Sequence, residues 1–228
     1  FKIHANIDPN HRNRIAFLKV VSGKFERNKQ YTHTRTGKTF RVSAPTAFMA
    51  EKKSIINEAY PGDIIGIPDN GTFRIGDTIT IKEDLHFTGI PSFSPEHFRF
   101  INNDDPLKAK QLAKGIDQLM DEGVAQLFTL KQNNRKIIGT VGALQYEVIQ
   151  YRLEHEYNAK CSYEAFHAFK ACWIESRDDT QLAEFSTLKQ RYLAEDKFGR
   201  PVFLADSQFS LQMAQEKFDK ITFHLKSE

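Results

Sequence analysis

The stretch YTHTRTGKTFRVS, residues 31–43, decides how the first half of the chain folds. Residues 31–35 and 39–43 have the composition of short β-strands. Between them lies Thr36-Gly37-Lys38, in which Gly37 can take the positive φ that a tight turn requires. The stretch therefore predicts a β-hairpin, and it carries three cations, Arg35, Lys38 and Arg41.

Short strands separated by turn residues continue on both sides of this hairpin. Residues 1–7 alternate apolar and polar, and 15–21 form an apolar run that ends at Ser22-Gly23. Pro61-Gly62 fits the central positions of a type II turn, and Asn70-Gly71 is a hairpin signal before a strand at 78–81. With no convincing amphipathic helix, six to eight such strands predict a small β-barrel over residues 1–90.

The chain changes character after the segment 91–95. Helices are predicted over 106–122, 143–157, 179–192 and 207–219, and strands over 125–130, 136–141, 160–166, 169–175, 201–205 and 220–225. This mixed β-α-β-β-α-β order predicts a second domain over 91–228. We expect an α+β fold with helices on one face of a mixed, largely antiparallel sheet. The boundary is placed between residues 88 and 95, and we find no internal sequence repeat.

Three of the helices carry apolar residues at helical spacing, the pattern of a helix with one buried side. The sets are Leu112, Ile116, Leu119 and Met120; Leu144, Val148 and Tyr151; and Phe185, Leu188 and Tyr192. The paired carboxylates Asp104-Asp105 and Asp178-Asp179 precede helices, so we expect capping and not acid-base chemistry. Trp173 falls within a strand pattern and is expected in the core.

Positive charge is concentrated in one part of the first domain. Residues 12–53 contain 11 Lys and Arg but only two acids, Glu26 and Glu51. A basic block of this kind is typical of a surface that binds phosphates, although an ordinary solvated face has the same composition. Phe25, Tyr31 and Phe40 lie among the cations, where they either stack on exposed bases or point inward as core positions of strands.

Catalytic and nucleotide-binding motifs are missing from the chain. Residues 37–39 end like a phosphate-binding loop, but Thr32 stands where that motif needs glycine, and the match lies between strands. There is no H-E-x-x-H, no Cys pair at metal spacing and no G-x-S-x-G. We expect no enzyme activity, bound nucleotide or metal from this chain alone. The two cysteines, Cys161 and Cys172, are expected to be reduced and inert, and no signal peptide or membrane span is visible.

Six segments carry a resemblance to a known family. They are FKIHANIDP (1–9), AFLKVVSGK (16–24), EAYPGDI (58–64), FTGIPSF (87–93), DPLK (105–108) and VGALQYE (141–147). The chain resembles the C-terminal two domains of bacterial peptide chain release factor 3, a translational GTPase. Residues 139–153 are also similar to a helix-containing segment of elongation factor G.

The resemblance implies a translation-factor β-barrel followed by an α+β domain, preceded by a GTPase domain that would hold GTP or GDP and Mg²⁺. Because the chain opens at Phe1 and not at Met, we interpret it as the C-terminal part of a longer protein. The family acts on the ribosome in the cytoplasm, where it helps to dissociate stop-codon-reading release factors. The implied partners are rRNA, ribosomal protein, those release factors and the GTPase domain in cis, with no membrane.

Within this frame, the basic block becomes a candidate rRNA-binding surface. The candidates, taken as a group, are Arg12, Arg14, Lys24, Arg27, Lys29, Arg35, Lys38 and Arg41. Residues 93–228 have 18 basic residues against 20 acidic ones, so we expect that half to contact protein. Two alternatives stay open: a stand-alone RNA-binding barrel protein, and a fragment of an elongation-type or ribosome-protection GTPase.

Overall fold

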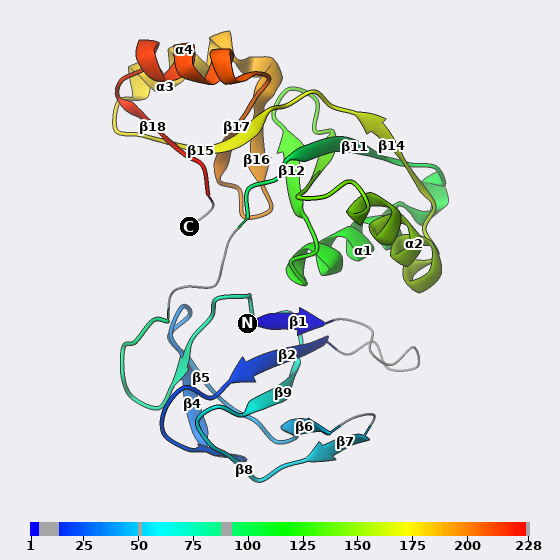
Figure 1. The fold of residues 1–228 in the computed structure, drawn as a ribbon, viewed down its shortest axis with the longest axis vertical. Coiled ribbons are helices and arrows are strands. Elements are labelled where there is room, and N and C mark those ends of the chain that lie inside the picture. Colours follow the sequence, from blue (N-terminus) through cyan, green and yellow to red (C-terminus); the bar gives the residue numbers. More distant parts are fainter. Residues whose placement is uncertain (5–13, 50–51, 88–92, 227–228) are drawn as a thin grey trace. The chain divides into compact units, whose positions relative to one another are not determined.

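The computed structural model describes residues 1–4, 14–49, 52–87 and 93–226. The chain divides into two compact units, one of residues 1–91 with 121–123, the other of the remaining residues. The segment at which we placed the boundary overlaps residues 88–92, which lie outside the described part. The two units are described separately below (Figure 1).

The first unit is built from three antiparallel sheets around one core. The sheet orders are β1-β2-β9-β6-β7, β10-β4-β5 and β3-β8. The strands are β1 (Lys2–His4), β2 (Arg14–Lys19), β3 (Phe25–Glu26), β4 (Gln30–His33), β5 (Lys38–Arg41), β6 (Thr46–Met49), β7 (Lys52–Ile55), β8 (Glu58–Ala59), β9 (Ile64–Asp69) and β10 (Ile79–Thr80). Ile3, Phe25, Tyr31 and Ile67 come from all three sheets and pack into one cluster. The predicted barrel-like arrangement is confirmed, and the described residues between 1 and 87 include no helix.

Two of the three predicted turns are confirmed in this unit. β4 and β5 pair antiparallel around a turn in which Gly37 has φ 66°. Gly62 has φ 101°, and the Asp63 amide donates to the Tyr60 carbonyl at 2.9 Å, as a type II turn requires.

The hairpin predicted at Asn70-Gly71 is wrong. The Asp69 carboxylate accepts hydrogen bonds from the backbone amides of Gly71, Thr72 and Phe73 at 3.0, 2.8 and 3.2 Å. A side chain that binds the following amides replaces the strand pairing that a two-residue hairpin turn would start. β10 therefore pairs with β4 and not with β9.

The second unit is a single antiparallel sheet of eight strands, in the order β14-β11-β13-β12-β16-β17-β15-β18. Its strands are β11 (His97–Asn103), β12 (Gln126–Leu130), β13 (Lys136–Thr140), β14 (Cys161–Ala165), β15 (Lys170–Ser176), β16 (Leu193–Asp196), β17 (Pro201–Ala205) and β18 (Ile221–His224). Its helices are α1 (Ala109–Asp121), α2 (Gln145–Tyr157), α3 (Asp179–Leu188) and α4 (Gln208–Lys217). Short 3₁₀ turns occupy Pro106–Lys108 and Gln190–Tyr192.

This sheet contains the same motif twice, which the sequence did not indicate. β11-α1-β12-β13-α2-β14 and β15-α3-β16-β17-α4-β18 are both β-α-β-β-α-β units, and each orders its strands fourth, first, third, second. This is the ferredoxin-like arrangement. The two copies join edge to edge through β12 and β16. Strands β11 and β16 were not predicted, and the third predicted helix ends at Leu188 and not at residue 192.

The two faces of this sheet bury different cores. On one face, Ile101, Leu127 and Ile138 pack against α1 and α2, while Cys172, Ile174 and Phe203 pack against α3 and α4. The opposite face forms a helix-free core that includes Phe128 of β12 and Trp173 of β15. Leu130 of the first copy and Ala194 of the second are paired across β12 and β16, and both point into the helix-free core. The helix-free faces of the two copies are therefore the same face of the sheet. All four helices lie on the other face, as predicted.

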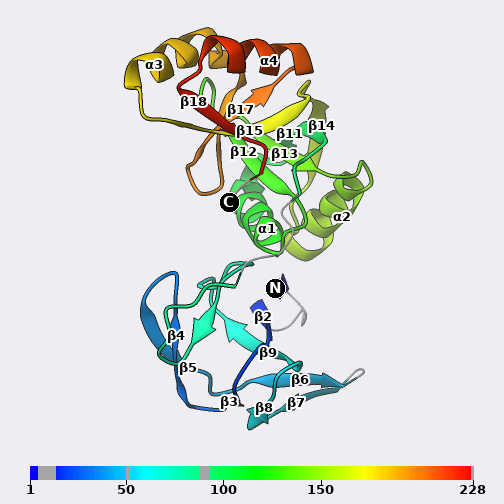
Figure 2. The same cartoon turned by 60° about the vertical axis from the view of Figure 1, so that its left-hand side comes forward.

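The sheet is strongly curled around its helix-free face (Figure 2). Phe128 and Trp173 stand three strands apart, a separation of about 14 Å in a flat sheet. Their ring centroids are only 6.1 Å apart. The curl brings both copies of the motif into one core and buries Trp173, as predicted.

The predicted helix faces are confirmed for α1 but wrong for α2. Leu112, Ile116, Leu119 and Met120 are all buried. In α2, by contrast, Leu144, Val148 and Tyr151 are 73%, 52% and 63% exposed. The buried side of α2 consists of Tyr146, Ile149 and Leu153 instead. In α3, Phe185 is buried as predicted, whereas Leu188 is 56% exposed.

Predictions about caps and cysteines are confirmed. Asp105 accepts from the Leu107 amide at 3.0 Å at the start of the first 3₁₀ turn. Asp178 caps α3 by accepting from the amides of Thr180 and Gln181 at 3.0 and 3.1 Å. Cys161 and Cys172 are free and buried, and burial raises the pKa of their thiols to about 11 and about 12.

Candidate nucleic-acid interface

The predicted cations are unequally available on the folded first unit. Arg12 lies outside the described residues. Arg14 is only 6% exposed. Its guanidinium lies 2.9 Å from the Asp69 carboxylate and donates to the Phe73 carbonyl at 3.0 Å. Because its donors serve contacts inside the unit, Arg14 is not available to bind a phosphate at this surface.

Arg35 is also engaged within the protein. Its Nε and Nη2 donate to the two carboxylate oxygens of Asp77 at 2.6 and 2.9 Å, and Nη2 reaches the Thr72 carbonyl at 3.0 Å. His33 Nε2 lies 2.8 Å from the same carboxylate. Burial favours the neutral form of Asp77, but the bonds from Arg35 and from the Arg74 amide outweigh it and hold the Asp77 pKa below its usual value. Arg35 thus ties the β4–β5 turn to the segment before β10.

Lys24 and Lys29 are paired with acids on the β3–β8 ribbon. Lys24 Nζ contacts Glu58, and Lys29 Nζ lies 2.9 Å from Glu26. Arg27 donates to the Ser43 carbonyl at 2.6 Å and forms no ion pair with a described residue. Asp69, Asp77 and Glu58 all lie outside residues 12–53. Folding therefore brings acids to a block that is almost purely basic in the sequence.

Lys38 and Arg41 remain as exposed cations on β5, without an ion pair to any described residue. β5 is the last strand of its sheet, and the two residues stand opposite His33 and Gln30 of β4. Arg27 contacts Ser43, two residues beyond Arg41, so it belongs to the same edge. Cations on an edge strand discourage strand pairing with other proteins, and they also suit a phosphate backbone. We call Arg27, Lys38 and Arg41 the β5 cation edge.

The aromatic residues among the cations do not form a base-stacking surface. Phe25 and Tyr31 are 8% and 5% exposed and stack on one another at 5.1 Å. Phe40 packs edge-on against Phe73 at 5.4 Å. Of the two alternatives for these side chains, the prediction that they point inward as core positions of strands is confirmed. Tyr60, which is 53% exposed, is one of the exposed aromatics of this unit that the sequence analysis missed. Its position directly before the Pro61-Gly62 turn was the available signal.

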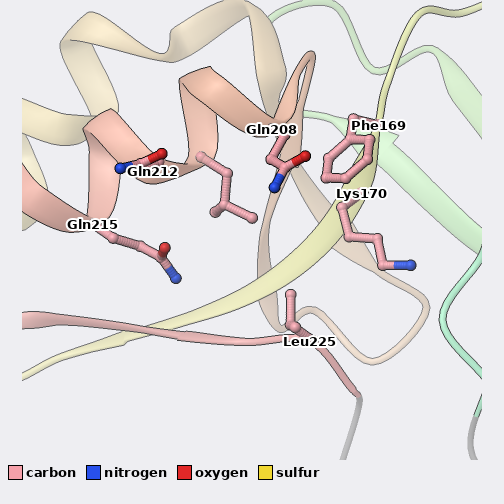
Figure 3. Close-up of a pocket in the computed structure, with 7 residues that line it drawn as sticks. Phe169, Lys170, Gln208, Gln212, Gln215 and Leu225 are labelled. Carbon is pink, nitrogen blue, oxygen red and sulfur yellow. The ribbon is translucent and has the colours of Figure 1, made fainter.

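A cavity of about 400 Å³ lies beside α4 in the second unit. Figure 3 shows three glutamines, Gln208, Gln212 and Gln215, along the helix, with Phe169, Lys170 and Leu225 beside them. None of the residues that line it is a carboxylate, a histidine or a cysteine. The cavity therefore offers no acid-base pair and no metal ligands beyond amide oxygens.

The described residues include no group of three or more His, Cys, Asp or Glu that could hold a metal ion. No helix in the described part of the chain is long and apolar enough to cross a membrane.

Comparison with known proteins decides the family. The family model for the C-terminal domain of class II release factor RF3 matches residues 87–215. The chain belongs to the RF3 family. The model for domain 2 of elongation factor G matches residues 1–82 of this RF3-family chain, so both units are domains of translation factors.

A solved structure from Thermus thermophilus, described as the crystal structure of ttk003000868, has the same fold. It is similar with a TM-score of 0.61 at 15% identity. The match covers 77% of this RF3-family chain and 28% of that chain. At this identity the likeness shows the fold alone.

Proposed function

We propose that this chain binds the ribosome during translation termination, as part of a translational GTPase that promotes dissociation of stop-codon-reading release factors. The observation that carries the proposal is the match of residues 87–215 to the C-terminal domain of release factor RF3. The match of residues 1–82 to an elongation factor G domain supports a shared ribosomal site for the barrel. In this proposal the protein acts in the cytoplasm.

The β5 cation edge is the part of the barrel that we propose to contact rRNA. Phosphate contacts by Lys and Arg release counterions, so binding through this edge should weaken as salt rises. We expect Lys24 and Lys29 to contribute less to rRNA binding than the β5 cation edge. Each is paired with a glutamate that must be displaced before the lysine can bind phosphate.

Charge reversal on the edge provides the test. In Lys38→Glu/Arg41→Glu, we expect co-sedimentation with purified ribosomes to weaken at least tenfold at low salt. The dependence of log K on log salt should become shallower by about two, since each phosphate contact contributes about one. Arg35 is left unchanged because its bonds to Asp77 and Thr72 are structural.

The matched control reverses two exposed lysines of the second unit, Lys110→Glu/Lys114→Glu, with the same change in net charge. We expect it to bind within about twofold of the wild type, because that unit is not the proposed RNA contact. Equal loss in both double variants would point to net charge alone, and unchanged binding of Lys38→Glu/Arg41→Glu would remove the edge from the interface.

We further propose that GTP or GDP and Mg²⁺ are held by a GTPase domain in cis. Such a domain should be encoded upstream of Phe1, with G-x-x-x-x-G-K-[ST] followed by D-x-x-G and N-K-x-D. Sequencing the upstream reading frame tests this directly. A frame that starts within a few residues of Phe1 would favour a stand-alone RNA-binding protein instead.

An elongation-type GTPase is the second candidate, favoured by the elongation factor G match over residues 1–82. A comparison of binding to ribosomes in different functional states distinguishes a termination factor from an elongation-type factor. A termination factor should bind better to ribosomes that carry a release factor, whereas an elongation-type factor should prefer pre-translocation ribosomes.

A further inference from the structure

Helix α2 has an apolar stripe on the side that faces away from its sheet. Leu144, Val148 and Tyr151 are 73%, 52% and 63% exposed, at positions one helical turn apart. The opposite side of the helix is already occupied, with Tyr146 and Ile149 at 1% and 0% exposure. A row of three exposed, large apolar side chains over the first two turns of a helix is typical of an interaction site.

The C-terminal end of the stripe is held in place by a second ring. His155 stacks on Tyr151 with ring centroids 3.9 Å apart and planes 22° from parallel. The His155 Nδ1 atom also lies 2.8 Å from the Tyr151 carbonyl. From Leu144 to His155 the stripe runs for about 16 Å at 1.5 Å per residue. A fixed aromatic ring at its end loses little side-chain entropy on binding, a property of residues that dominate interfaces.

The charges beside the stripe are acidic. Glu147 is exposed, Glu154 is partly exposed, and neither forms an ion pair with a described residue. On the other flank, Arg152 Nε binds Glu156 Oε1 at 2.6 Å, which neutralises that pair. The charges left over are therefore carboxylates, which repel phosphates and attract Lys and Arg.

We infer that this α2 stripe binds a protein surface in which apolar side chains are bordered by Lys or Arg. RNA is disfavoured as the occupant, because two of the exposed side chains are aliphatic and the bordering charges are negative. The inference rests on the proposed function, since it places this basic protein partner on the ribosome, and it assigns to the second unit a contact separate from the β5 cation edge.

The second copy of the motif supplies a matched control. Aligning the buried Tyr146, Ile149 and Leu153 of α2 with Leu211, Ala214 and Phe218 of α4 brings equivalent outward positions together. Leu144 then corresponds to Phe209, which is 72% exposed, and Val148 corresponds to Met213, which is 46% exposed. Glu147 corresponds to the neutral Gln212. At the remaining positions Glu154 corresponds to Asp219 and Tyr151 to Glu216, so α4 carries a similar apolar pair but neither the acid between its two members nor the aromatic ring.

Two double variants test the inference by co-sedimentation of the chain with purified 70S ribosomes. Leu144→Asp/Val148→Asp should raise the apparent Kd at least tenfold, while Phe209→Asp/Met213→Asp should stay within about twofold. Circular dichroism and thermal unfolding check that both remain folded. Equal weakening in the two variants, or none in either, would overturn the inference and leave the proposed function standing if the wild type binds. Failure of the wild type to bind would remove the proposed function and this inference with it.

Cross-linking identifies the occupant and does not depend on the aspartate variants. With p-benzoylphenylalanine in place of Tyr151, irradiation of the ribosome complex should attach the chain to a ribosomal protein or bound factor with a basic surface. A cross-link to rRNA, a cross-link only between two copies of this chain, or no cross-link on ribosomes that bind the chain would each overturn the inference. Glu147→Lys should also weaken binding, because it reverses the charge that borders the stripe.

Discussion

Gly115 of α1 packs directly against two side chains of α2, Leu153 and Tyr157. A Cβ atom at this position would lie 2.6 Å from Leu153 Cδ2 and 2.9 Å from Tyr157 Cγ. Alanine favours helix by about 1 kcal/mol over glycine. The overpacking that it causes in a filled core costs about 1–3 kcal/mol, so we expect the clash to dominate. Gly115→Ala should therefore lower the free energy of unfolding in urea. Gly142→Ala, where a Cβ meets nothing within 4 Å, is the control and should change it by less than about 0.5 kcal/mol.

Asp77 makes the stability of the first unit depend on pH. A carboxylate whose pKa is lowered on folding adds stability above its unfolded value of 3.8, and this stability is lost as the pH falls through the folded pKa. Asp77→Asn should therefore be less stable at pH 7, where it loses the charge partner of Arg35 and His33. It should also show a weaker loss of stability below about pH 4. Urea unfolding at several pH values checks both. Asp84, whose side chain is 94% exposed, is the control position, and Asp84→Asn should behave as the wild type.

At the scale of elements, Ser207 fixes the start of α4. Its hydroxyl accepts a hydrogen bond from the Ser210 amide at 3.1 Å. Ser207→Ala should cost about 1 kcal/mol of unfolding free energy, whereas Ser207→Gly should cost only a few tenths. Thermal unfolding of the two variants provides the comparison, and equal losses would mean that the cap bond contributes little.

Elements were predictable from sequence where a local pattern had one structural solution. The Gly37 turn, the buried side of α1 and the Asp178 cap are of this kind. Prediction failed where two solutions compete. α2 is apolar on two sides, and periodicity alone cannot tell a core side from a binding side. At Asn70-Gly71 the Asp69 carboxylate binds the following backbone amides, so the predicted hairpin does not form. Strand β11 was not predicted, although the buried Phe98 and Phe100 alternate within it. The sequence predicted the region of the candidate interface but not which of its cations are free. The acids that pair with several of these cations are distant in sequence.

At the scale of the whole molecule, the two copies of the β-α-β-β-α-β motif share one core and should unfold together. Phe128 of the first copy is fully buried against Trp173 of the second. Phe128→Ala should cost about 3–5 kcal/mol. Trp173, the one tryptophan of the chain, should report this loss by fluorescence although it belongs to the other copy. In the second unit expressed as residues 93–228, urea unfolding followed by far-UV circular dichroism should have the same midpoint as unfolding followed by Trp173 fluorescence. Two separate transitions would show that the copies are independent.

The burial of both cysteines makes this chain ready for site-specific labelling. With pKa values of about 11 and about 12, fewer than about one thiol in 10³ is ionised at pH 7, and maleimide dyes react with the thiolate. A single cysteine placed at an exposed position, such as 38 or 148, would then be the one reactive thiol among the described residues. Fluorophores could be attached to either proposed contact without first removing a native cysteine from the core.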